Sequence, residues 1–141
     1  MAFTPSYIGL HGKGTLRKRI QTLNEFLKGC RLCPRECCIN RLNGETGYCR
    51  AGAKLEISSA FPHFGEEAPL VGNHGSGTIF LAHCNLRCVF CQNYDITHMG
   101  RGSLVSPSGL AKIMAQLQEA GCHNINFVTP EHVVPQILAA C

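Results

Sequence analysis

The chain has 141 residues, of which 10 are cysteines, and its hydrophobic and charged fractions of 45% and 16% describe a globular protein and exclude a disordered one. No apolar run reaches the roughly 18 residues that span a bilayer, so we expect no association with membranes. The net charge of +4 at pH 7 is spread loosely and tryptophan is absent, which argues against a nucleic-acid partner.

The expected compartment follows from the amino terminus. The first residues lack a basic segment followed by a long apolar one, so we expect no secretory signal and a cytoplasmic protein. Thiols stay reduced in the cytosol. Clustered cysteines in that compartment bind metals or take part in catalysis rather than form disulfides.

The first half of the chain combines a helix with a cysteine-rich segment. Apolar residues at helical spacing predict a helix that Thr15 caps and that runs to about Lys28. Five cysteines follow within residues 30–49. Weak alternation of apolar and polar residues predicts a short strand over 55–60, and the stretch 62–77, rich in glycine and proline, is typical of a loop.

The second half of the chain alternates strands and helices. A compact apolar run predicts a buried strand over 78–82. Ser106 caps a helix that continues to about Ala120, a second strand covers 124–128, and another helix starts at His132. This order predicts an α/β fold with a right-handed, parallel strand–helix–strand unit.

The motif with the clearest chemistry comes directly after the predicted strand over 78–82. Cys84, Cys88 and Cys91 form a C-x3-C-x2-C triad, and three thiolates on one short loop can ligate three irons of a cubane iron–sulfur cluster. The loop supplies no fourth cysteine, so the remaining iron stays open for an exogenous ligand, as catalytic zinc sites keep an open position. The same spacing also falls on one face of a helix, where cysteines would only pack in a core.

The run GTIFLAHCNLRCVFCQN, residues 77–93, closely resembles the signature of radical S-adenosylmethionine (SAM) enzymes. Within that superfamily, residues 30–52 and the segment FGEEAPLVGNHGSGTIF are similar to proteins related to pyruvate formate-lyase activating enzymes, and the resemblance extends from about Leu16 onward. It implies that residues 77–141 begin a partial (β/α)6 radical SAM barrel with two βα units. Residues 1–76 would then be an N-terminal helix with a cysteine-rich, metal-binding extension and a loop.

The resemblance also implies a reaction. Cys84, Cys88 and Cys91 would ligate a 4Fe–4S cluster, and SAM would chelate the fourth iron. An electron from a low-potential donor such as flavodoxin or ferredoxin would reduce the cluster, which would cleave SAM to methionine and a 5′-deoxyadenosyl radical. That radical would abstract a hydrogen atom from the substrate, for which a glycyl residue of a partner protein is one candidate.

Two further residues match SAM contacts of the family. Phe90 matches the aromatic residue beside the last cysteine, near the adenine, although an ordinary core aromatic is an equal alternative. The family's Gly-Gly-Glu run, which contacts the SAM amino group, reads Thr129-Pro130-Glu131 in this chain. Glu131 keeps its place and could accept a hydrogen bond from the ammonium, or act only as a charge at the start of the last helix.

The first cysteine group is a candidate for a second metal site. Cys30, Cys33 and Cys37 precede a glycine-containing turn that leads to Cys49. Four thiolates on two short turns suit either zinc or a second iron–sulfur cluster. Cys38 adjoins Cys37, and either of the two can be the third ligand.

Two other functions are compatible with the same cysteines. One is a non-enzymatic module in which zinc or iron–sulfur centres hold an interaction surface, and the other is an electron carrier. The length adds an expectation, because a complete eight-unit β/α barrel takes about 250 residues. We therefore expect the 141 residues to be an N-terminal piece that carries the cluster loop and is inactive alone.

Overall fold

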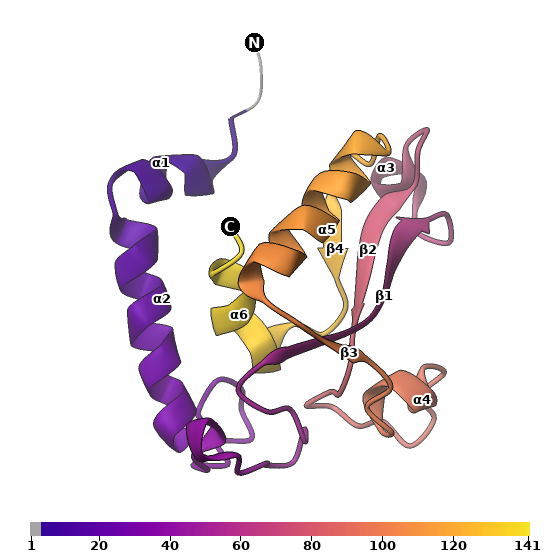
Figure 1. Ribbon diagram of the computed structural model, residues 1–141. Helices are drawn as coiled ribbons and strands as arrows, with labels where there is room; N and C mark the ends of the chain where they lie inside the picture. The colour runs from indigo at the N-terminus through magenta and orange to yellow at the C-terminus, as the bar shows by residue number, and fades with distance from the viewer. Residues whose placement is uncertain (1–3) are drawn as a thin grey trace.

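The computed structural model describes residues 4–141, which build a mixed sheet of four strands with helix α5 (Pro107–Glu119) across one face (Figure 1). Strands β2 and β4 are parallel, whereas β1 runs antiparallel to both β2 and β3. The fold is therefore mixed α/β, and the predicted parallel unit is confirmed in β2, α5 and β4. The strands lie in the order β3-β1-β2-β4 and are β1 (Leu55–His63), β2 (Ser76–Leu81), β3 (Ser103–Val105) and β4 (Ile125–Phe127).

Strand β1 continues to His63, beyond its predicted end, into a stretch that we expected to be loop. The Phe61 ring stacks on Phe80 of β2 with 5.5 Å between the ring centroids, and such cross-strand pairs stabilise extended backbone. Proline is tolerated at position 62 because β3 pairs only with Leu55–Ile57. Along the described chain, no strand therefore lies on the outer side of Pro62 to require its missing N–H.

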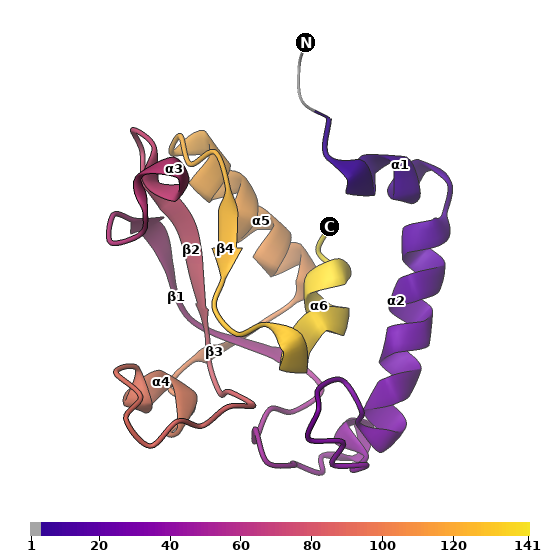
Figure 2. The same cartoon turned by 180° about the vertical axis from the view of Figure 1, so that it is seen from behind.

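The predicted N-terminal helix is α2 (Thr15–Glu25), which packs against α6 (Val134–Leu138) beside the sheet (Figures 1 and 2). It ends in a tighter 3₁₀ turn, η1 (Phe26–Gly29). A glycine caps the helix rather than the predicted threonine. Gly14 adopts a left-handed φ of 68°, which lets the chain turn from α1 (Ser6–Gly12) into α2.

Helix α5 begins and ends as predicted. The Ser106 hydroxyl accepts a hydrogen bond from the Gly109 N–H at 3.0 Å, and Gly121 leaves the helix with a φ of 95°. No helix among residues 4–141 combines the length and the apolar character needed to cross a membrane. The other elements are short, namely η2 (Arg41–Asn43), α3 (Ala68–Val71), α4 (Tyr94–Thr97) and η3 (Glu131–Val133).

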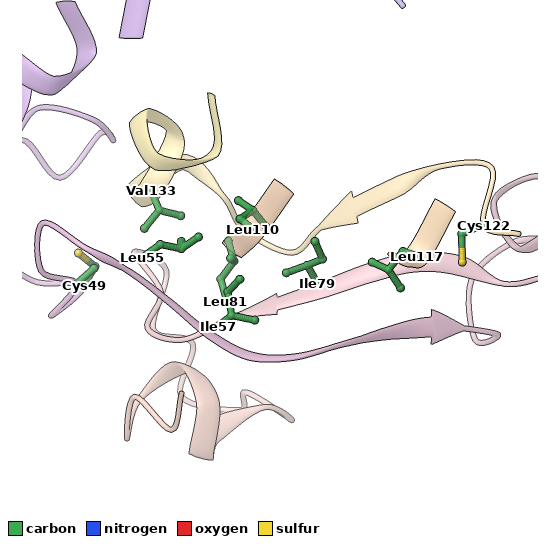
Figure 3. Packing of buried hydrophobic residues seen from close by; sticks show 10 residues of the cluster. Cys49, Leu55, Ile57, Ile79, Leu81, Leu110, Leu117, Cys122 and Val133 are labelled. Carbon is green, nitrogen blue, oxygen red and sulfur yellow. The ribbon is translucent and has the colours of Figure 1, made fainter. Parts of the chain in front are cut away.

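The hydrophobic core lies between the sheet and α5 (Figure 3). Ile79 of β2 and Leu110 of α5 are completely buried, and Val133 of η3 packs into the same cluster. Two cysteines close the row of side chains, with Cys49 at one end and Cys122 at the other. The core therefore fixes one member of the first cysteine group.

Both parallel strands direct their carboxyl ends to the same end of the sheet (Figures 1 and 2). The loop that follows β2 carries the triad, and the cysteine-rich segment 30–49 lies beside that loop. The Arg35 Nε donates a hydrogen bond to the Asn85 carbonyl at 3.2 Å, across 50 positions of sequence. The fold thus gathers both cysteine groups at one end of the sheet.

Two leucine substitutions test this core. Leu110 is 0% exposed and Leu104 of β3 is 64% exposed, so the same change to alanine removes buried methyl groups at one site and solvated ones at the other. We expect Leu110→Ala to lower the free energy of unfolding by about 2–5 kcal/mol and Leu104→Ala by less than about 0.5 kcal/mol. Urea denaturation measures both, and equal losses would contradict the packing described.

Candidate metal-binding site

The triad lies in the loop that leaves β2. The chain between β2 and α4 contains turns but no helix, so its cysteines do not share the helix face on which the alternative of simple packing was based. All three thiols are free. Cys84 is buried, whereas Cys88 and Cys91 are half-buried.

Hydrogen bonds reach two of the three sulfur atoms. The Leu86 N–H donates to the Cys84 Sγ at 3.3 Å, and the Thr97 hydroxyl lies 3.3 Å from the Cys91 Sγ. Between the first two cysteines, Arg87 adopts a left-handed φ of 50°, which bends the loop back on itself.

The other two candidate residues lie close to this loop in sequence or in space. Phe90 is 87% exposed and its neighbour Val89 is 93% exposed, so the alternative of an ordinary core aromatic is wrong. Glu131 opens η3 immediately beyond β4 and is exposed. It shares a cavity of about 460 Å³ with residues of both cysteine-rich segments, among them Arg35, Asn85 and Leu86.

The first cysteine group surrounds a second, much smaller cavity. Backbone hydrogen bonds hold its segment in a tight loop, from the Cys30 N–H to the Ile39 carbonyl at 2.8 Å and from the Cys38 N–H to the Cys30 carbonyl at 3.0 Å. Cys38 is exposed and does not line the cavity. The cavity measures about 10 Å³, and its lining includes Cys30, Cys33, Cys37 and Cys49.

Neither cysteine group is a finished metal site. Across residues 4–141, no set of three or more His, Cys, Asp or Glu side chains is arranged to hold a metal ion. The chemistry of the donors nevertheless fits, because each group offers free thiols from short loops, and thiolates are the ligands of iron–sulfur clusters and of structural zinc. Binding therefore requires the thiols of a group to turn toward a common point.

Sequence reasoning missed two buried residues beside the first group. Arg41 is 1% exposed, and its guanidinium donates to the carbonyls of Gly52 and, at 2.6 Å, His132. Its Nη1 also lies 3.9 Å from the Cys30 Sγ. His132 is likewise 1% exposed. Arginine is seldom fully buried, so only the position of Arg41 among the cysteines could have indicated that it is buried beside them.

Burial shifts two titratable groups in this region. It lowers the pKa of His132 to about 4, against a weaker opposing effect of the hydrogen bond to the Ala82 carbonyl, so the imidazole is neutral near pH 7. Burial also raises the pKa of the Cys49 thiol, while a backbone hydrogen bond at Ala51 and the charge of Arg41 oppose that shift.

One tyrosine connects the two cysteine-rich loops. The Arg35 guanidinium lies 3.9 Å from the centroid of the Tyr48 ring, and the Arg87 guanidinium of the triad loop lies 5.9 Å from it. Cation–π contacts of this kind are attractive at such distances. Tyr48 and Arg87 stand far apart in sequence, so no local pattern could have predicted the contact.

The chain is similar to a protein of Methanocaldococcus jannaschii, the Uncharacterized protein MJ0674. The two sequences are 34% identical over 117 residues, which cover 78% of this chain and 33% of the relative. The chain thus spans about a third of the length of that relative. No protein-family profile matches the chain, and no solved structure matches it.

The buried His132 predicts an acid-sensitive fold. Its pKa falls from the ordinary 6.5 to about 4, so between these values the unfolded chain binds a proton that the folded chain does not. Stability is therefore complete above about pH 6.5 and decreases as the pH falls toward 4, by about 3 kcal/mol in total.

The measurement is urea denaturation at a series of pH values, with His132→Gln as the comparison. The variant keeps every other acid-sensitive group, so the difference between the two curves isolates the histidine. We expect the variant to lose less stability between pH 6.5 and 4 than the unaltered protein. Parallel curves would show that burial of the imidazole does not set the acid response.

Proposed function

We propose that this chain is the cluster-binding part of a radical SAM iron–sulfur protein of the group related to pyruvate formate-lyase activating enzymes. The observation that carries the proposal is the C-x3-C-x2-C loop, whose three free thiols follow directly on the parallel strand β2. The carboxyl ends of parallel strands are where β/α barrels hold their chemistry. In this proposal, β2 and β4 are the first two strands of a partial (β/α)6 barrel.

The triad and its hydrogen-bond donors have defined roles in this proposal. Cys84, Cys88 and Cys91 hold a 4Fe–4S cluster and leave one iron for SAM. When bound, the reduced cluster supplies the electron that cleaves SAM and yields the 5′-deoxyadenosyl radical for hydrogen abstraction. The Leu86 N–H donates toward Cys84, the Thr97 hydroxyl lies within hydrogen-bond distance of Cys91, and hydrogen bonds to ligand sulfur adjust the reduction potential.

Phe90 and Glu131 are the proposed contacts to SAM. The exposed Phe90 ring is free to lie against the adenine, and the Glu131 carboxylate borders a cavity at the triad loop, where it can accept a hydrogen bond from the ammonium. Thr129, in place of a family glycine, has a left-handed φ of 53°. A β-branched residue adopts this conformation only under strain, and such strain clusters at functional sites.

The exposed surface around the triad supports a role for partners. Leu86, Val89 and Phe90 are 54%, 93% and 87% exposed, and several large apolar side chains exposed on one loop are typical of a face that a ligand or protein covers. The proposed electron donor is a cytoplasmic flavodoxin or ferredoxin. The proposed hydrogen donor is a glycyl residue of a protein substrate.

Removal of one triad thiol tests the cluster. After anaerobic reconstitution with iron and sulfide, we expect a brown protein with about four iron atoms at the triad. Cys88→Ser should lose that iron and its visible absorption, because two cysteines cannot hold the cluster. Cys141→Ser is the matched control, since Cys141 is an exposed thiol outside both groups. Iron and sulfide analysis with absorption spectra measures the result.

The outcomes separate the proposal from the other two functions. A Cys88→Ser variant with as much iron and sulfide as the unaltered protein would refute the assignment of the triad. A cluster that forms but releases no 5′-deoxyadenosine from SAM in the reduced full-length protein would indicate an electron carrier. Zinc without iron in the triad would indicate a non-enzymatic module.

A further inference from the structure

The buried charge of Arg41 lacks an ordinary counter-ion. Four ion pairs with carboxylates occur among the described residues. Two involve a lysine or an arginine and two involve a histidine, and none of them includes Arg41. The guanidinium of Arg41 donates hydrogen bonds to neutral backbone carbonyls. Its other polar neighbour is the Cys30 Sγ, at 3.9 Å. A buried guanidinium without an anion is strongly destabilising. Protonated thiols cannot neutralise it, whereas thiolates can.

The cavity beside Arg41 has the size of an ion. At about 10 Å³ it admits roughly one water-sized sphere, so it suits a single metal ion and is too small for a four-iron cubane. Four cysteines contribute to its lining, Cys30, Cys33, Cys37 and Cys49, and each is a free thiol.

We infer that the first cysteine group is a closed, structural zinc site with Cys30, Cys33, Cys37 and Cys49 as ligands and Arg41 as its buried counter-charge. Zinc with four thiolates carries two net negative charges, and the guanidinium offsets one of them. On binding, the thiols turn into the cavity and release their protons to solvent. The inference is independent of the proposed function, which depends on the triad alone.

The structure also selects Cys37 over its neighbour. Cys37 lies against Gly47, in the turn that leads to Cys49. If residue 47 had a Cβ atom, that atom would lie 2.9 Å from both the Cβ and the Sγ of Cys37. Only glycine permits this approach. Cys38 is exposed and lies outside the cavity lining, so it is not a ligand.

A zinc ion at this position would stabilise the neighbouring triad loop. Cys49 belongs to the hydrophobic core, and Arg41 holds the carbonyl of His132 in the turn beyond β4. From the same segment, Arg35 donates to the Asn85 carbonyl between the first two triad cysteines. The zinc site is thus connected by direct contacts to the loop that we propose holds the cluster.

The first test compares two adjacent cysteines. Zinc and iron are measured by mass spectrometry in the protein purified under reducing conditions, and Co²⁺ replaces zinc to report tetrahedral thiolate coordination by its visible absorption. We expect about one zinc per chain, lost in Cys37→Ser and retained in Cys38→Ser. In reconstituted samples, the triad iron of Cys38→Ser should equal that of the unaltered protein.

Several results would overturn the inference. These are loss of zinc in Cys38→Ser but not in Cys37→Ser, iron with sulfide in place of zinc, a cobalt spectrum without thiolate bands, or zinc that depends on His132 and not on Cys49. If the triad cluster forms while zinc does not bind, the zinc site alone is wrong. If zinc binds while the triad cluster does not form, the proposed function alone is wrong.

The second test removes the counter-charge. Arg41→Gln keeps two N–H donors but no charge, so we expect zinc affinity to fall about 10- to 100-fold, as for other residues outside the metal ligands. Arg50→Gln is the matched control, because Arg50 adjoins Cys49 but is exposed. Competition with a chromogenic chelator measures affinity, and circular dichroism confirms folding. Equal affinities in folded Arg41→Gln and Arg50→Gln would show that Arg41 does not balance the site.

Discussion

The parallel pairing of β2 with β4 is the constraint from which the candidate site follows. Gly77 pairs with Ile125 and Ile79 with Phe127, so both strands run in the same direction, and β2 continues two residues beyond the last pair to Leu81. The pairing needs a glycine at its start, because a Cβ atom on Gly77 would lie 2.7 Å from the Asn124 carbonyl oxygen. Since the strands are parallel, the chain must cross between them, and α5 does so over the core.

The buried polar side chain of Arg41 helps to hold the cysteine-rich segment against this sheet. That segment buries few large apolar residues, so hydrophobic packing alone holds it weakly. Arg41 instead donates hydrogen bonds to carbonyls 11 and 91 positions away, at Gly52 and His132. Hydrogen bonds from a charged donor are stronger than those from neutral ones, and buried donors must be satisfied. Arg41 therefore joins the cysteine-rich segment to the chain just before β1 and to η3.

The sequence predicts the elements whose signals are local. Helix α5 has its serine cap, its apolar stripe and its glycine end, and all three appear in the structure. The end of β1 could not be predicted, because it depends on Phe61 stacking with Phe80, a contact between strands. The C-x3-C-x2-C spacing is also a local signal, and it predicts that the three thiols share one loop after the strand, where the structure has them. The burial of Arg41 and His132 could not be predicted, because each depends on segments that are distant in sequence.

The two cysteine groups differ in a way that bears on their chemistry. The triad stands on an open loop with apolar side chains in solvent, and Cys88 and Cys91 are only half-buried. The first group adjoins the core through Cys49 and surrounds a cavity the size of an ion beside a buried cation. An open set of three thiols leaves a coordination position for a reactant, whereas a closed set of four leaves none. The same ligand type is therefore suited to reactivity at one site and to stability at the other, because burial and ligand count differ.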